Sequence, residues 1–156
     1  MMKLKIKKLS ANAVIPTFAH EDDAGMDLYA VENDVVKSGE WKKIPTGIAI
    51  QLEKGTEAQI RPRSGLAMKY GVTMLNTPGT IDSGYRGEIC VLLINHRKND
   101  FLIQAGDRIA QMVIASYIHP EVEIVETLEE SVRGQDRKST RLNSSHRCTS
   151  RMPSSA

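Results

Sequence analysis

The chain has 156 residues, of which 40% are hydrophobic, 26% charged and only 4% aromatic, and this composition predicts one globular domain with an aliphatic core. Its net charge of +2 combines a net −2 over residues 1–135 (16 basic, 18 acidic) with a net +4 over residues 136–156 (5 basic, 1 acidic). The apolar runs are too short for a membrane protein, and the lysines throughout the first ten residues exclude a secretory signal. The chain has only two cysteines, which excludes a fold held by several disulfides and favours a reducing, cytoplasmic location.

Short extended segments, separated by turn residues, run along most of the chain. Residues 3–9 alternate lysine with leucine or isoleucine, which is the pattern of a half-exposed strand. Further extended runs are predicted at residues 26–30, 35–36, 41–45, 47–52 and 58–61. Residues 65–70 are the one segment that favours a helix, of about two turns.

Three apolar segments follow in the second half of the chain. Residues 88–96 form a near-continuous apolar run, typical of a strand buried on both faces. Residues 108–118 are rich in β-branched side chains, and residues 122–125 alternate with glutamate, which predicts an edge or exchanged strand. The pattern as a whole predicts an all-β fold, a distorted jelly-roll β-barrel with one short helix.

The composition changes at residue 136, so we predict a domain over residues 1–135 and a disordered, non-native tail over residues 136–156. The tail reads DRKSTRLNSSHRCTSRMPSSA and resembles a sequencing adapter translated in one frame; the alternative is an ordinary flexible tail. On the adapter interpretation, native sequence stops at Gly134 or Gln135. The basic tail is the one feature that suggests nucleic-acid binding, so we predict no nucleic-acid partner, and no membrane partner.

Two clusters of residues could carry chemistry. In RPRSGLA, residues 61–67, a helix start, the Ser64 hydroxyl and the Arg63 guanidinium could cradle a polyphosphate; the alternative is an N-cap serine beside a surface arginine. In NTPGTIDSGYRGEI, residues 76–89, a hairpin with glycine-containing turns flanks Asp82, and Tyr85 follows. Such a hairpin could read the edge of a flat base, or it could be a tight turn in which Asp82 is structural.

Two further stretches place polar groups beside strands: AGMDLYA, with Asp27, and GDRIAQ, with a turn Asp107 and with Gln111. The four stretches, in this order and spacing, resemble the first four of the five motifs of the homotrimeric dUTPases, the deoxyuridine triphosphate nucleotidohydrolases. The resemblance covers residues 3–135. Arg133, followed by Gly-Gln, matches the opening of the fifth motif, and the apparent adapter replaces the rest.

The resemblance implies hydrolysis of dUTP to dUMP and pyrophosphate by in-line attack of water on the α-phosphorus. Asp82 would orient and deprotonate the water and contact the 3′-hydroxyl. Tyr85 would stack on the deoxyribose and leave no room for a 2′-hydroxyl. Asn76 and the backbone around Thr80 and Ile81 would read uracil and reject cytosine.

On the phosphate side, the resemblance implies that Arg63, Ser64 and Gly65 hold the phosphate chain and that Gln111 adds a contact from the neighbouring chain. Asp27 would act through water on a Mg²⁺ coordinated chiefly by the triphosphate, with no direct protein ligand to the metal.

The resemblance further implies a homotrimer in which each site uses three chains. Arg133 would clamp the phosphates from the fifth motif, in the manner of an arginine finger. Without the rest of the arm, we expect this chain to fold, to bind dUTP weakly and to turn over slowly.

Two alternatives remain open. A dCTP deaminase shares the fold, but that family needs a glutamate within the strand after the hairpin, and CVLLIN has none, while Glu88 comes too early. A non-catalytic nucleotide-binding module would have no use for Asp82 as a water-activating carboxylate.

Overall fold

The computed structural model describes residues 1–136; residues 137–156, which hold nearly all of the predicted tail, lie outside the described residues. The chain divides into two compact units, Met1–His119 and Pro120–Ala156. The first unit holds every strand and helix that is assigned within residues 1–136. The predicted domain boundary after residue 135 and the predicted origin of the tail stay predictions.

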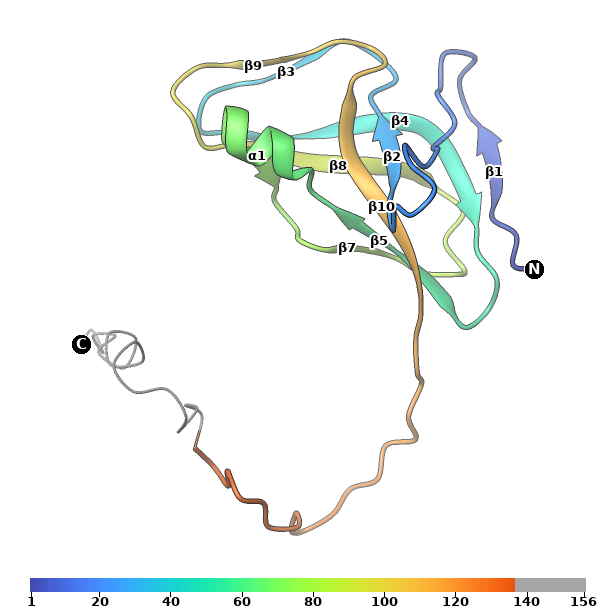
Figure 1. The fold of residues 1–156 in the computed structure, drawn as a ribbon, viewed down its shortest axis with the longest axis vertical. Helices are drawn as coiled ribbons and strands as arrows, with labels where there is room; N and C mark the ends of the chain where they lie inside the picture. The colour runs from blue at the N-terminus through green and yellow to red at the C-terminus, as the bar shows by residue number, and fades with distance from the viewer. Residues whose placement is uncertain (137–156) are drawn as a thin grey trace. The chain divides into compact units, whose positions relative to one another are not determined.

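Eight strands form two antiparallel sheets (Figure 1). In the first sheet, the order is β1 (Lys5–Lys8), β4 (Trp41–Gln51), β8 (Glu88–Asn95) and β6 (Val72–Met74). In the second, it is β2 (Met26–Tyr29), β10 (Arg108–Ser116), β5 (Thr56–Arg61) and β7 (Gly79–Ile81). β3 (Asp34–Val36) and β9 (Phe101–Ile103) pair as a ribbon, and α1 (Ser64–Tyr70) follows β5.

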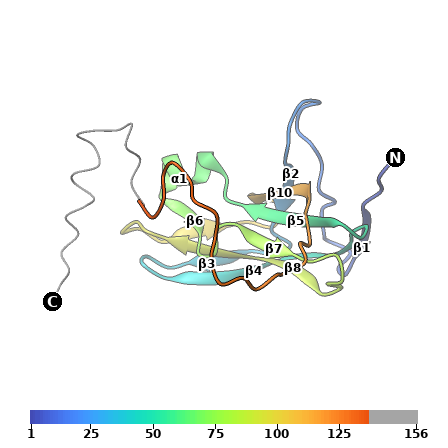
Figure 2. The ribbon, with the colours of Figure 1, turned by 90° about the horizontal axis from the view of Figure 1, so that it is seen from below.

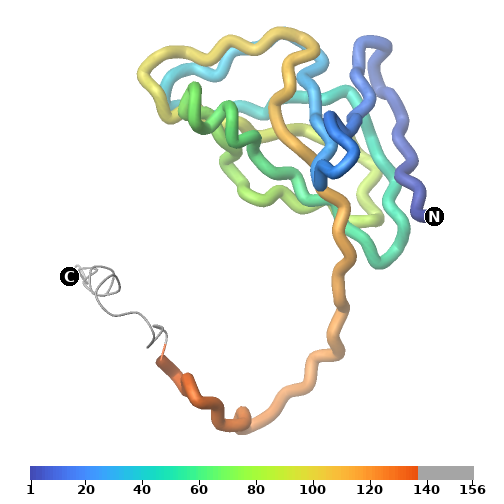
Figure 3. Tube along the Cα trace, viewed as in Figure 1, coloured from blue at the N-terminus to red at the C-terminus, as the bar shows by residue number. Residues whose placement is uncertain are grey.

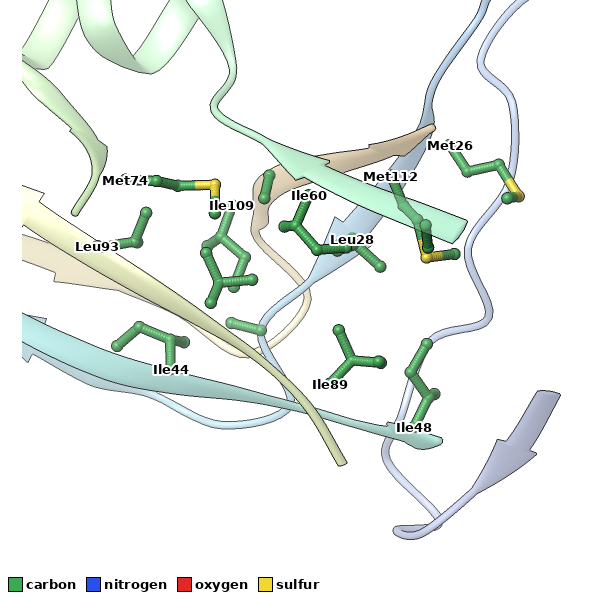
Figure 4. Packing of buried hydrophobic residues seen from close by; sticks show 14 of the residues in the cluster. Met26, Leu28, Ile44, Ile48, Ile60, Met74, Ile89, Leu93, Ile109 and Met112 are labelled. Atoms are coloured by element: carbon green, nitrogen blue, oxygen red, sulfur yellow. The ribbon is translucent and has the colours of Figure 1, made fainter. Parts of the chain in front are cut away.

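The core lies between the two sheets, which Figure 2 shows as two layers. Leu28, Ile60 and Met112 of the second sheet are fully buried, and so are Ile89 and Leu93 of the first. These side chains point toward one another in Figure 4. The predicted aliphatic core and the predicted all-β fold of jelly-roll type with one short helix are confirmed, although residues 1–136 form two open sheets and a ribbon, not one closed barrel.

β4 is one strand where the sequence predicted two. Its pairing with β8 shifts register between Pro45 and Ala49, where the prediction ended one strand at residue 45 and began the next at residue 47. Gly47 adopts a φ of 75° there, which favours glycine, and its amide donates a 2.8 Å hydrogen bond to the Glu88 carboxylate. The strand therefore bulges and continues.

The prediction that residues 88–96 are buried on both faces holds for only one face within the single chain. Along β8 the side chains alternate between buried and half-buried positions, so one face packs on the core and the other is partly open. Cys90, Leu92 and Ile94 lie on the half-buried face. The sequence of this segment is continuously apolar because both faces of the strand carry apolar side chains. Only one of these faces is packed against other residues of the same chain.

Residues 122–125, predicted as an edge or exchanged strand, are not a strand in the structure. Between residues 120 and 136, no helix or strand is assigned. A strand requires a partner that exchanges backbone hydrogen bonds, and the described residues offer none to this segment. The exchanged form, which needs a second chain, stays a prediction.

The residues around Asp82 connect the two sheets. The sequence predicted a hairpin here, but β7 pairs with β5 in one sheet, whereas β8 pairs with β4 and β6 in the other. Residues 82–87 are therefore a crossing between sheets, which we call the 82–87 connection. Figure 3 shows this yellow-green turn at one end of the first unit and α1 at the other end.

Candidate functional site

Five of the predicted site residues line one hollow of about 300 Å³ at the 82–87 connection. They are Asn76, Thr80, Ile81, Asp82 and Tyr85. The structure adds four lining residues that the sequence did not single out for this purpose, which are Lys43, Glu88, Cys90 and Leu92. The last three lie at alternate positions of β8, and this half-buried face of the strand supplies one wall of the hollow.

Asp82 and Tyr85 are held by the backbone of the connection. The Tyr85 amide donates a 3.0 Å hydrogen bond to the Asp82 carbonyl, and the Arg86 guanidinium donates to the carbonyls of Ser83 and Tyr85 at 2.7 and 3.1 Å. No described residue forms a hydrogen bond or an ion pair with the Asp82 carboxylate, which is exposed. This carboxylate is therefore available to water or ligand.

The strand β7 presents backbone groups to the same hollow. It is one of the two edge strands of its sheet, with β5 on one side only. Thr80 faces Gln59 and Ile81 faces Ala58 in that pairing. An edge strand leaves every second N–H and C=O group unpaired, so β7 can offer donors and acceptors to a planar ligand edge.

A second group of predicted residues lies where three neighbouring strands meet. On β10, Gln111 faces Asp27 of β2 on one side and Arg61 of β5 on the other. Its side-chain amide donates a 3.1 Å hydrogen bond to the Pro62 carbonyl. The chain then turns into α1, with Arg63 at the N-cap position, followed by the exposed Ser64 and Gly65. The sheet thus brings Asp27, Gln111 and the start of α1 together.

The Asp27 carboxylate lies between two arginines. Its Oδ1 is 3.9 Å from Arg63 Nε and its Oδ2 is 3.8 Å from Arg108 Nη1. Arg63 also donates a 3.3 Å hydrogen bond to the Arg108 carbonyl. The Asp27 side chain is 17% exposed. Both N–O distances are those of ion pairs and are too long for hydrogen bonds. Each guanidinium therefore retains N–H groups that could donate to a ligand.

Arg108 is the functional candidate that sequence reasoning missed. In a regular strand, residues 108 and 111 point to opposite faces, because side chains alternate. The pairing of β10 with β2 shifts register between Arg108 and Ala110, and this bulge turns Arg108 toward Asp27. Arg108 and Arg63 both line a hollow of about 440 Å³ bounded by α1, β9 and the start of β10.

The two groups lie far apart within one chain, since their two hollows share no lining residue. In the β5–β7 pairing, Ile60 faces Gly79 and Ala58 faces Ile81. Asp82 therefore lies beyond one end of this antiparallel pair, and Arg63 beyond the other, six strand positions away. At 3.3 Å per residue, the separation is about 20 Å.

Other chemistries find less support in these residues. Within residues 1–136, no three His, Cys, Asp or Glu side chains gather as a metal site, and no helix is long and apolar enough to cross a membrane. The Glu88 carboxylate lines the first hollow, but it accepts a hydrogen bond from the Gly47 amide, which is a structural contact. Burial and the nearby Glu88 raise the pKa of the free Cys90 thiol, so it is protonated at neutral pH.

Comparison with known proteins gives one consistent family. The dUTPase family model matches residues 11–140. The deoxyuridine 5'-triphosphate nucleotidohydrolase of Gloeothece citriformis is 57% identical over 133 residues, which cover 85% of this chain and 92% of that protein. The Clostridioides difficile protein of the same name is 56% identical over 135 residues, which cover 86% and 94%.

Solved structures agree with the fold. A mutant dUTPase of Staphylococcus bacteriophage 80alpha, determined with dUpNHpp, superimposes with a TM-score of 0.80 at 30% identity, covering 88% of this chain and 95% of that one. A mutant dUTPase of the S. aureus phage phi11, described with a structural Mg(II) ion, gives 0.76 at 27% identity, covering 82% and 99%. Since sequence, fold and motif geometry agree, this chain belongs to the dUTPase family.

Proposed function

We propose that this chain hydrolyses dUTP to dUMP and pyrophosphate by in-line attack of water on the α-phosphorus. The observation that carries the proposal is the hollow at the 82–87 connection. There an exposed carboxylate without a protein partner, that of Asp82, lies beside an edge strand and an aromatic ring. A carboxylate within one hydrogen bond of a water can orient it and accept its proton.

The nucleoside half of the substrate fits this hollow. Asn76 and the unpaired backbone groups around Thr80 and Ile81 would read uracil, and the Tyr85 ring would stack on the deoxyribose. Cytosine reverses a donor and an acceptor on its edge, so it would leave buried amide groups of the site unpaired and bind poorly. A 2′-hydroxyl would meet the Tyr85 ring, which favours deoxyribonucleotides.

The triphosphate fits the second group of residues. Arg63 and Gln111 would hold phosphate oxygens, while the Ser64 hydroxyl and the Gly65 backbone would lie near the bridging oxygen whose charge grows as pyrophosphate leaves. Arg108 adds a second guanidinium on the same side of Asp27. Two cations beside one partly exposed carboxylate suit a highly charged phosphate chain.

Magnesium would bind mainly to the triphosphate. Asp27 is a single carboxylate already engaged with two arginines, which fits contact through water and does not fit direct coordination. Bound Mg²⁺ would neutralise phosphate charge. Asp27 would at the same time keep Arg63 and Arg108 aimed at the phosphates.

The site would be shared between chains of a homotrimer. Asp82 and Ser64 cannot touch one phosphate within a chain if about 20 Å separates the two ends of the β5–β7 pair, so a second copy would supply the missing half. The half-buried apolar face of β8 and the exposed Trp41 next to it on β4 offer contact surface for that copy. We also place the enzyme in the cytoplasm, whose reducing conditions suit the free Cys90.

Arg133 would complete the phosphate clamp from the second unit. Its guanidinium Nε donates a hydrogen bond to the Asp136 carbonyl within a local turn. The family's glycine-rich arm, with its phenylalanine, would follow there. Without it we expect closure over the substrate, and therefore turnover, to be impaired.

The test is pyrophosphate release from dUTP, dCTP and UTP with Mg²⁺, for the wild-type chain, D82N and the matched surface variant D22N. We expect release from dUTP only, a loss of at least about 100-fold in D82N and no loss in D22N. A version with a glycine-rich, phenylalanine-containing arm after Gly134 should be faster than the wild-type chain. Ammonia release from dCTP would instead support a deaminase, and dUTP binding without turnover in either version would support a binding module.

A further inference from the structure

The ring of Tyr85 rests on the backbone of Gly87. A Cβ built on Gly87 would lie 2.6 Å from Tyr85 Cζ and 3.0 Å from Cε1, and closer still to the hydroxyl oxygen. Real Cβ atoms essentially never approach heavy atoms that closely, so the ring occupies space that any other residue at position 87 would fill. The ring therefore keeps this position because residue 87 has no side chain.

The backbone itself does not require glycine at position 87. Gly87 is not among the glycines with positive φ, so an alanine there would be unstrained but for the ring. Gly84 in the same connection also lacks a positive φ, yet a Cβ there would meet nothing within 4 Å. The two glycines of the 82–87 connection thus differ in one respect, the contact with Tyr85.

The other anchor of the ring is a fixed acceptor. The Tyr85 hydroxyl donates a 3.1 Å hydrogen bond to the Glu88 carbonyl. Glu88 is the first residue of β8, where it pairs with Ala49 of β4, and its carboxylate accepts the Gly47 amide at 2.8 Å. The acceptor is thereby tied to the sheet. The other side of the ring is free, since Tyr85 is 45% exposed and lines the hollow.

We propose that Gly87 is a positioning residue that sets sugar selectivity through Tyr85. The inference rests on the proposed role of Tyr85 against the deoxyribose. A side chain at position 87 displaces the ring, because a half-exposed side chain turns about χ1 at less cost than a strand-anchored backbone shifts. With the ring displaced, the contact that leaves no room for a 2′-hydroxyl is lost.

The experiment compares kcat/KM for dUTP and for UTP in G87A and in the matched control G84A. We expect G87A to lower the dUTP-to-UTP ratio by about tenfold or more, and G84A to leave it unchanged, with the Tm of both close to that of the wild-type chain. An unchanged ratio in G87A, or an equal loss in G84A, overturns the proposal.

A double-mutant cycle with Y85A shows whether the effect passes through the ring. We expect Y85A to lower the ratio, and G87A added to Y85A to lower it no further. An equal further loss in the double variant overturns the proposal. If Y85A itself leaves the dUTP-to-UTP ratio unchanged, the proposed sugar contact of Tyr85 is wrong and this inference is wrong with it. A lower ratio in Y85A but not in G87A refutes only the proposed role of Gly87.

A third variant keeps the test independent of folding in G87A. Y85F removes the hydrogen bond to Glu88 but keeps the ring on Gly87, so we expect it to retain most of the dUTP preference. A Y85F enzyme as unselective as Y85A would show that the hydroxyl, and not the contact with Gly87, holds the ring.

Discussion

If the two halves of the site come from different chains, as proposed, two inactive variants should restore one another when they are mixed. D82N removes the carboxylate at one end of the β5–β7 pair, and R63A removes the guanidinium at the other end. Six strand positions, or about 20 Å, separate them within a chain. Neither variant can repair itself, whereas an interface between an R63A chain and a D82N chain can hold one intact site.

The size of the recovery follows from the symmetry. If the two variants are unfolded together in equal amounts and refolded into trimers, a site is intact when its Asp82 comes from an R63A chain and its Arg63 from a D82N chain. Each choice has a chance of one half, so about one quarter of the sites should be active. Pyrophosphate release from dUTP should therefore reach about one quarter of the wild-type rate.

The matched control mixes D82N with Y85A. Both residues line the same hollow of the same chain, so no arrangement of these two variants creates a site with both residues intact. The mixture should be no more active than its better component. No recovery in the D82N and R63A mixture, or equal recovery in the control, would refute the shared site.

Three further outcomes follow from individual contacts. G25A should raise the KM for dUTP more than it lowers kcat, because a Cβ on Gly25 would lie 2.5 Å from the Gln111 side-chain oxygen and would displace the proposed phosphate contact of Gln111. Initial rates over a range of dUTP concentrations measure both constants. L93A should lower the free energy of unfolding by about 2–5 kcal/mol in urea titrations at fixed protein concentration, because Leu93 is 1% exposed in the core; a loss below about 1 kcal/mol would contradict this packing. Burial alone would raise the pKa of Asp34, but hydrogen bonds from Lys42 and from the backbone outweigh it and hold that pKa below its usual 3.8. The carboxylate therefore stabilises the fold above about pH 4, and this contribution is lost as the pH falls through the lowered pKa, so D34N should lose less stability than the wild-type chain on acidification from about pH 6 to about pH 3.

The strands with a clear period could be predicted from the sequence, but their partners could not. The alternating lysines of β1 and the β-branched run of β10 mark strands whatever lies beside them. β6 and β9 have three residues each, too few to show a period. The glycine-containing turns around Asp82 fit a hairpin or a crossing equally well, and only the pairing of β7 with β5 distinguishes the two.

The site residues within one motif could be grouped from the sequence, but contacts that depend on strand pairing could not. Asn76, Asp82 and Tyr85 are close in sequence, and they do share a hollow. Arg108 was missed because its position beside Asp27 depends on a β-bulge, which reverses the direction that simple alternation predicts. The contact of the Tyr85 ring with Gly87 likewise could not be predicted, because a spacing of two residues does not by itself indicate a side-chain contact.

Attack of water on the α-phosphorus can be followed by hydrolysis of dUTP in water enriched in oxygen-18, with mass spectrometry of both products. If water activated by Asp82 attacks the α-phosphorus, a single turnover forms the new P–O bond on that atom, and the label appears in dUMP. We expect labelled dUMP and unlabelled pyrophosphate. Label in pyrophosphate would show attack on the β-phosphorus and would contradict the placement of Asp82 as the group that directs the water.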